Sequence, residues 1–173
     1  HGFEVAVLLN GGYPEFSPVY SGNDFSQNKY ANSVAVTGEL RGGSWTHVGG
    51  YLHFVRQTAI LKDNATLTIQ PGSVIKFSAS GSLRLGEKSQ LIAHGTLTET
   101  IVFTSLQDDV YGGDTNGDGG LTVPILGDWN GIESYGNLSL VDLAYVQLRF
   151  PYEAIDGRGH VTVRDSVVEK SST

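Results

Sequence analysis

An acidic, glycine-rich stretch, DTNGDG at residues 114–119, holds side chains whose types and spacing suit metal binding. Asp114, Asn116 and Asp118 place oxygens at the first, third and fifth positions, and a glycine stands at the sixth. This pattern is the opening half of an EF-hand-type calcium loop, in which alternate residues of a tight turn aim their oxygens at one centre. The stretch therefore predicts a Ca²⁺ site.

The predicted calcium site needs further ligands, because Ca²⁺ takes about six to eight oxygens. The bidentate Glu of an EF-hand loop is absent, and Ile125 stands in its place. The nearest other carboxylates are Asp108, Asp109 and Asp128, and we expect them to complete the site with a backbone carbonyl near residue 120. A metal-free surface turn and another divalent ion are the alternatives. Zinc is disfavoured, since the chain has no cysteine and no paired histidines.

The calcium stretch lies inside a longer acidic loop, residues 106–128, which carries no strand pattern. A loop of this length in a compact domain needs a function or a ligand. Bound calcium would order the loop and hold it against the rest of the fold, adding stability and protease resistance in a calcium-rich exterior. We therefore expect the ion to be structural, with Trp129 and Ile132 returning the chain to the core.

Short strand-like runs surround the acidic loop, and no helical period separates them. In LTIQPGSVIKF, residues 67–77, two such runs flank a Pro-Gly corner. Others lie at 33–37, 50–55, 59–61, 83–85, 91–93, 101–103, 131–134, 138–140, 144–150 and 161–168. Similar runs recur about every 20–25 residues, the length of one coil of three short strands. Alternate apolar residues give each strand one inward face, which predicts an all-β fold, a parallel solenoid whose coils bury one another.

The order of several motifs resembles a known family. LTIQPGSVIKF is followed by G-x-L runs over residues 81–97, then by IVFTSLQDD, GGDTNGDGG, GDWNGI and LAYVQLRF. Together they resemble the right-handed parallel β-helix repeats of large secreted and cell-surface bacterial proteins, in the pectate-lyase-like superfamily. The resemblance covers about residues 38–173 and implies that fold. It implies little about activity, since the scaffold carries lyases, hydrolases, adhesins and structural stalks.

The ends of the chain differ from its middle. Residues 1–37 show no solenoid spacing, and we expect them to form an irregular N-terminal cap on a parallel β-helix of residues 38–173, since a terminal coil exposes strand edges. A linker folded onto the surface is the alternative for this segment. The last residues still have a strand-like pattern, and we therefore expect the chain to be a piece of a longer exported protein. An exposed terminal coil would also allow end-to-end self-association.

Composition narrows the location and the partners of the protein. The net charge of −7 argues against binding to nucleic-acid backbones. No apolar run approaches the roughly 18 residues that cross a bilayer, so we expect no membrane span. Without cysteine there is no disulfide framework and no thiol nucleophile. We expect a secreted or cell-surface protein.

Catalytic signals in the sequence are weak. Pectate-lyase-type chemistry pairs calcium with an Arg or Lys base, for which Arg149 and Arg158 are candidates without a recognisable arrangement. Glycoside hydrolysis needs two carboxylates across a cleft, and Asp108, Asp109 and His160 resemble polygalacturonase motifs only faintly. The sequence assigns no catalytic residue, and enzymatic activity is the minority interpretation.

Two functions follow from these observations. The first is a structural or adhesive, calcium-stabilised β-helix module of an exported cell-surface protein. The alternative is a carbohydrate-active β-helix that binds or cleaves an acidic polysaccharide, with exposed aromatic residues as stacking platforms. A cleft lined by Arg or Lys beside the acidic loop would favour the second function, and an ion enclosed by its own loop would favour the first.

Overall fold

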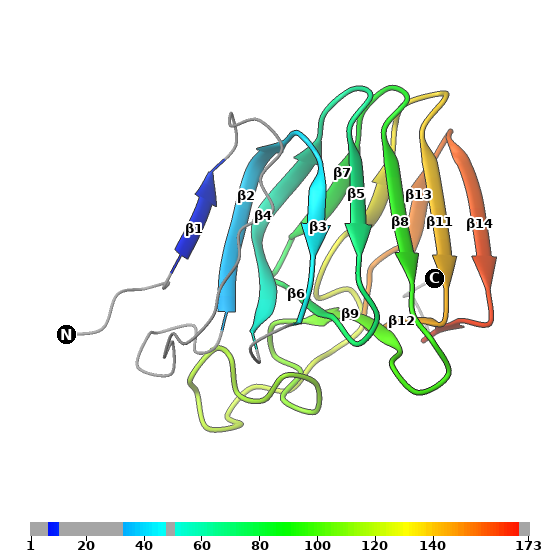
Figure 1. Cartoon of the computed structure of the whole chain (residues 1–173). Coiled ribbons are helices and arrows are strands. Elements are labelled where there is room, and N and C mark those ends of the chain that lie inside the picture. The colour runs from blue at the N-terminus through cyan, green and yellow to red at the C-terminus, as the bar shows by residue number, and fades with distance from the viewer. Residues whose placement is uncertain (1–6, 11–32, 48–50, 170–173) are drawn as a thin grey trace.

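The computed structural model describes residues 7–10, 33–47 and 51–169 of the chain (Figure 1). Those residues form an all-β structure, which confirms the predicted class, and they contain no helix long and apolar enough to cross a membrane. The strands are β1 (Val7–Asn10), β2 (Ser33–Leu40), β3 (Gly43–Trp45), β4 (Leu52–Leu61), β5 (Thr66–Ile69), β6 (Val74–Phe77), β7 (Ser82–Leu85), β8 (Gln90–His94), β9 (Ile101–Ser105), β10 (Gly131–Ser134), β11 (Leu140–Ala144), β12 (Val146–Leu148), β13 (Ile155–Gly157), β14 (His160–Arg164) and β15 (Val167–Val168).

The strands pair in parallel and form two curled sheets. The larger sheet has the order β13-β10-β7-β4-β6-β9-β12-β15, with β2 also paired to β4 and β1 to β2, and the smaller has the order β14-β11-β8-β5-β3. Strand β4 is long enough to serve two strands in succession: His53 near its start pairs with Ile75 of β6, and Ala59 near its end pairs with Leu83 of β7. Figure 1 shows the successive strands stacked side by side along one axis. The arrangement is compatible with a β-helix-like solenoid.

The register of the smaller sheet follows the coil length read from the sequence. Leu67 pairs with Leu91, which lies 24 residues later. Val141 pairs with Val161, 20 residues later. Between them, Leu91 pairs directly with Val141 although 50 residues separate the two, because residues 106–128 leave the coil and return to it. The acidic loop is therefore an insertion into an otherwise regular stack.

The expected N-terminal cap, residues 1–37, lies mostly outside the described residues. Within it the structure describes only β1 and the start of β2, which pair in parallel with each other. The boundary expected at residue 37 falls inside β2, which continues to Leu40 and pairs with β4. The division into a cap and a β-helix stays a prediction.

Alternating apolar residues fill the space between the curled sheets. Leu67, Leu91 and Val141 are fully buried. The inward positions of β14, Val161 and Val163, are each 42% exposed, because β14 is the last strand of its sheet in the described part of the chain. An open strand edge with partly exposed valines is a surface on which a further strand could stack. End-to-end self-association stays a prediction.

One core position is occupied by a histidine. His53 of β4 is 4% exposed and stacks on Trp45, with ring centroids 4.7 Å apart and planes 7° from parallel. Its Nδ1 has no hydrogen-bond partner among the described residues. Burial disfavours the charged imidazolium and lowers the pKa of His53 from 6.5 to about 3. The ring therefore acts as a neutral aromatic residue at neutral pH.

The buried His53 predicts an acid-sensitive fold. Because its folded pKa lies below its unfolded value, the unfolded state takes up the proton first, and stability is lost as pH falls from about 6.5 towards 3. Between pH 7 and pH 5 we expect His53 to account for a loss of about 2 kcal/mol in the free energy of unfolding. Urea unfolding of the wild type and of His53→Phe, which keeps a ring against Trp45, measures this difference. Equal pH dependence of the two proteins would contradict it.

Candidate metal centre

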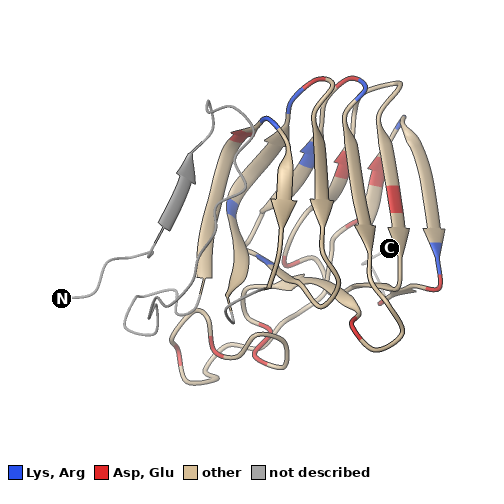
Figure 2. Ribbon diagram, in the orientation of Figure 1, with Lys and Arg blue, Asp and Glu red and all other residues tan. Residues whose placement is uncertain are grey.

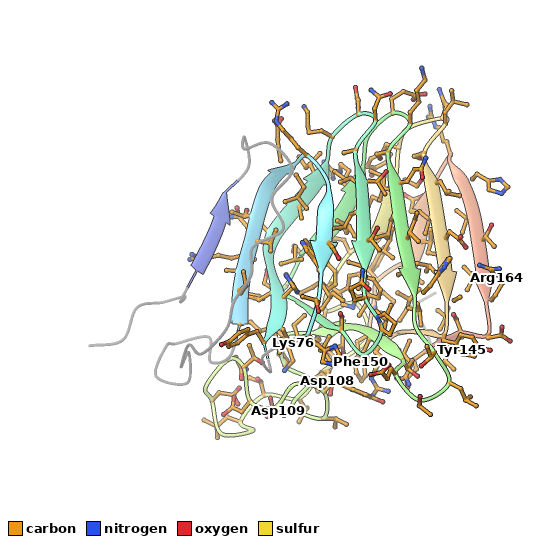
Figure 3. The ribbon with its side chains drawn as sticks, viewed as in Figure 1. Lys76, Asp108, Asp109, Tyr145, Phe150 and Arg164 are labelled. Atoms are coloured by element: carbon orange, nitrogen blue, oxygen red, sulfur yellow. The ribbon has the colours of Figure 1, made fainter. Side chains whose placement is uncertain are left out.

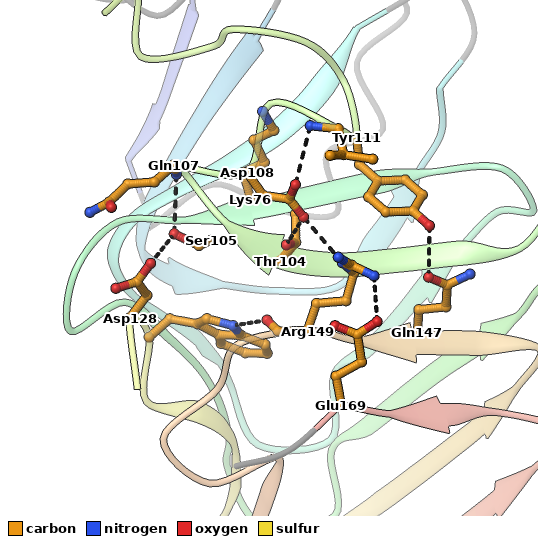
Figure 4. Close-up of polar contacts among 12 residues, drawn as sticks. Lys76, Thr104, Ser105, Gln107, Asp108, Tyr111, Asp128, Gln147, Arg149 and Glu169 are labelled. Carbon is orange, nitrogen blue, oxygen red and sulfur yellow. Dashed lines mark hydrogen bonds and ion pairs between the residues drawn. The ribbon is translucent and has the colours of Figure 1, made fainter. Parts of the chain in front are cut away.

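The acidic loop leaves the coil after β9 and is fastened at both ends. At its start, the backbone N–H of Leu106 donates to the carbonyl of Phe77 at 2.7 Å. At its end, the carboxylate of Asp128 accepts from Ser105 Oγ at 2.7 Å and from the backbone N–H of Ile125 at 3.1 Å (Figure 4). Asp128, expected as a metal ligand, thus links the two ends of the loop.

Asp108, another expected ligand, is buried against the coil. Its carboxylate accepts hydrogen bonds from Thr104 Oγ1 at 2.6 Å, from Arg149 Nε at 3.2 Å and from the backbone N–H of Val110 at 3.2 Å (Figure 4). Its side chain is 1% exposed. The structure gives Asp108 protein donors on both oxygens and does not bring it into the carboxylate cluster described next.

Three of the expected ligands converge. Asp109, Asp114 and Asp118 place carboxylate oxygens within 4.8 Å of one another. Figure 2 shows acidic residues, in red, along the loop beneath the coil, whereas many of the other charges lie on the strands and on the corners at the far end. We call this group the acidic triad. The triad joins one residue near the start of the loop to two residues in its middle. These residues are separated in the sequence and meet only because the backbone of the loop folds back.

The backbone of the loop wraps the carboxylates of the triad. Asp114 accepts from the N–H groups of Gly117 at 2.8 Å, Asp118 at 3.1 Å and Gly119 at 2.8 Å. Both glycines lie at positive φ, 70° and 69°, a region that residues with a side chain adopt at a cost. The turn can therefore close around Asp114 because glycine stands at these two positions.

Asp118 is held in the same way on the far side of the turn. It accepts from the backbone N–H groups of Gly120 at 2.8 Å, Leu121 at 3.0 Å and Thr122 at 3.0 Å, and from the Thr122 hydroxyl. The Thr122 side-chain hydrogen bond, followed by the backbone donors, lowers the pKa of Asp118. The carboxylate is thereby kept ionised, as a metal ligand must be.

Two side-chain oxygens of the candidate ligands, one of them in the triad, have no hydrogen-bond partner among the described residues. Asp109 Oδ1 and Asn116 Oδ1 are both shielded from solvent, and neither accepts a hydrogen bond within the described part of the chain. The amide of Asn116 instead donates to Asp118 Oδ2 at 2.9 Å and to Thr122 Oγ1 at 3.0 Å. A buried acceptor without a donor is unfavourable unless a cation or water binds it. Both oxygens belong to residues that the sequence pattern selected as ligands.

The surroundings of Asp109 disfavour the ionised form of its carboxyl group. Loss of hydration on burial, and then the neighbouring Asp114, raise the pKa of Asp109 above its usual value, while Lys76 opposes the shift. A divalent ion among the triad would supply the positive charge that this carboxylate lacks.

Lys76, which no sequence motif indicated as part of the site, lies beneath the loop. It belongs to β6, is fully buried, and donates from Nζ to the carbonyl of Gly113 at 2.6 Å. Figure 3 places it at the base of the loop beside Asp108 and Asp109. Burial lowers the pKa of Lys76 to about 8, and attraction to Asp109, Asp108 and Asp114 limits the shift. The only signal in the sequence is a lysine in the apolar run VIKF.

A hollow of about 230 Å³ lies between the loop and the coil, and Arg149 forms part of its wall. Arg149 is paired with Asp108 and Glu169, and its guanidinium stacks 4.9 Å from the ring centre of Tyr111 (Figure 4). Its side chain is 16% exposed. With two carboxylates already on it, Arg149 is poorly placed to act as a base or to bind an anionic sugar.

Comparison of the chain with known proteins adds no family assignment to this geometry. No protein-family model, no curated protein and no solved structure matches the chain.

Proposed function

We propose that this chain is a structural module of an exported cell-surface protein: a right-handed parallel β-helix, of the pectate-lyase-like kind, whose acidic loop binds one Ca²⁺ and is thereby clamped to the coil. The observation that carries the proposal is the convergence of the acidic triad, in which one buried oxygen, Asp109 Oδ1, lacks a partner, as does Asn116 Oδ1 of the same loop. Display or adhesion is the role that such a stiff stack of coils would serve.

Calcium is the ion that the donor set suits best. All the candidate ligands are oxygens, which hard cations prefer, and no cysteine is present to select a softer metal. Asp109, Asp114, Asp118 and Asn116 would supply side-chain oxygens, and water or loop carbonyls would complete the shell. Mg²⁺ fits less well, because it demands near-octahedral geometry and is rarely held in a cage made by one protein loop.

The ion would link parts of the loop that the coil does not hold directly. The two ends are fastened by Phe77 and Ser105, whereas the turn at 114–119 is stabilised mainly by its own backbone donors. A ligand that binds only the folded loop stabilises the fold in proportion to the logarithm of its concentration. Calcium would therefore protect the longest irregular segment among the described residues from local opening and proteolysis.

The alternative, a carbohydrate-active β-helix for acidic polysaccharides, is supported by the hollow beside the loop, which Arg149 and Phe150 help to line. The pairing of Arg149 with Asp108 and Glu169 opposes it. A sugar-binding function would need this guanidinium to be released, so the structural module is the better supported of the two.

The calcium proposal predicts a metal-dependent stability. With free Ca²⁺ at about 100 times its dissociation constant, the free energy of unfolding should rise by about 2.7 kcal/mol over the value in EDTA. Asp114→Ala/Asp118→Ala should abolish the rise, because two of the triad carboxylates are lost. Urea unfolding in EDTA and in calcium measures both.

The matched control is Asp156→Asn, which removes an exposed carboxylate of β13 outside the loop and should leave the calcium response unchanged. Magnesium at the same concentration should give a smaller rise than calcium. If wild-type stability is the same in EDTA and in calcium, the clamp is wrong and the loop is a metal-free turn.

A further inference from the structure

We infer that Lys76 tunes the charge selectivity of the acidic loop: its buried ammonium repels a trivalent cation more strongly than a divalent one and thereby shifts the preference of the site towards divalent ions. This inference rests on the proposed calcium site and goes beyond it, because it assigns selectivity to a residue of the coil that cannot itself be a cation ligand.

The contact between Lys76 and the loop is direct. Its Nζ donates to the carbonyl of Gly113, the residue before Asp114, at 2.6 Å. The loop backbone also lies on the stem of the side chain, since a methyl group added at Gly112 would meet Lys76 Cε at 3.5 Å. The ammonium is thus fixed under the triad and shielded from solvent, where salt screens its charge little.

The charges around the triad give a simple balance. With a cation bound, the three carboxylates of the triad would contribute three negative charges. Asp108, the next carboxylate along the chain, is paired with Arg149, whereas the cation that acts on Asp109 is Lys76. One ammonium against three carboxylates leaves two negative charges. Without Lys76 the balance would be three, so the loss of the ammonium would strengthen the attraction for every cation in proportion to its charge.

Coulomb's law separates this electrostatic role from a structural one. The repulsion between Lys76 and a bound ion is proportional to the charge of the ion, so its removal should strengthen binding of a trivalent ion more than binding of a divalent one. The logarithmic gains should stand in the ratio of three to two. A loss of loop anchoring alone would change the affinity for both ions by the same factor.

Two substitutions isolate the charge. Lys76→Met keeps the length of the buried stem and removes the ammonium. Lys76→Gln also removes the charge but keeps an N–H donor for the Gly113 carbonyl, and it serves if the methionine variant does not fold. Lys76→Arg keeps the charge and should keep the wild-type preference. Lys62→Met removes an exposed lysine that pairs with Glu39 and is the surface control.

Calorimetric titration of each protein with Ca²⁺ and with Tb³⁺ at pH 6.5, well below the ordinary pKa of a lysine, gives the required affinities. If the neutral variants bind Ca²⁺ about tenfold more tightly, they should bind Tb³⁺ about thirtyfold more tightly. Equal factors for the two ions, or weaker binding of both, would overturn the inference and leave the calcium site standing. If the wild type binds neither ion, the calcium site itself is wrong.

Discussion

Replacing Trp129 with alanine is expected to lower the free energy of unfolding by about 4 kcal/mol, the range of large aromatic-to-alanine changes in cores. Trp129 is fully buried, and its ring stacks on Phe77 with centroids 4.1 Å apart and planes 11° from parallel. Its indole N–H donates to the carbonyl of Arg149 at 2.7 Å. The substitution would leave a cavity and an unsatisfied carbonyl at the point where the acidic loop rejoins the coil.

Urea unfolding followed by circular dichroism measures this loss. Tyr152→Ala is the control, since Tyr152 is an aromatic residue of the same region with 61% of its surface exposed, and its removal should change stability by less than about 0.5 kcal/mol. A Trp129→Ala variant within 1 kcal/mol of the wild type would mean that the core around Phe77 can collapse into the vacated space.

Gly131→Ala is expected to destabilise the fold by about 3 kcal/mol or more, although it adds a single methyl group. Gly131 begins β10 with φ of 109°, a conformation that a residue with a side chain rarely adopts. A Cβ atom there would lie 1.7 Å from the carbonyl oxygen of Glu153 in the next coil. Because the obstacle is backbone, it cannot move aside as a side chain would, and the two coils would have to separate.

The control for Gly131→Ala is Gly113→Ala in the acidic loop. Gly113 also has positive φ, 74°, but a Cβ atom there would meet nothing within 4 Å. Alanine at this position should therefore cost only the left-handed backbone strain, about 1–2 kcal/mol. Thermal and urea unfolding of the two variants separate the cost of backbone strain alone, at Gly113, from the cost of strain and a steric clash, at Gly131. Equal losses in the free energy of unfolding would show that the spacing between the coils at Gly131 adapts freely.

The sequence was most informative where structure depends on neighbouring residues. The alternation of Leu67 with Ile69 and of Val161 with Val163 predicted inward faces. Leu67 and Ile69 are buried, whereas Val161 and Val163 are each 42% exposed, because β14 has no described strand stacked on its outer side. The runs at 50–55 and 59–61, expected as separate strands, form the single strand β4. Their separation was wrong because a strand can bend and change partners without ending, and the residues between do not reveal this.

The same distinction between local and long-range contacts applies to the candidate site. Asp114, Asn116 and Asp118 were found because their spacing is local, whereas the adjacent Asp108 and Asp109 could not be told apart. In the structure the side chain of Asp108 pairs with Arg149, whereas Asp109 belongs to the triad. Lys76 escaped notice because its contact with Gly113 joins residues 37 positions apart, a separation that only the stacking of the coils closes.

The insertion of the acidic loop has an evolutionary consequence. Leu83 pairs with Ile132 and Leu91 with Val141 as if no residues intervened, so the strand register on either side does not depend on the length of the loop. Selection can therefore lengthen, recharge or replace the outer part of this segment while the scaffold stays intact, provided that Asp108 and Gly113 keep their contacts with Arg149 and Lys76. The same scaffold could acquire new surface chemistry by exchange of one segment, and an engineer could graft a new segment between Gly113 and Ile125, which leaves the contacts of Asp108 and Asp128 in place.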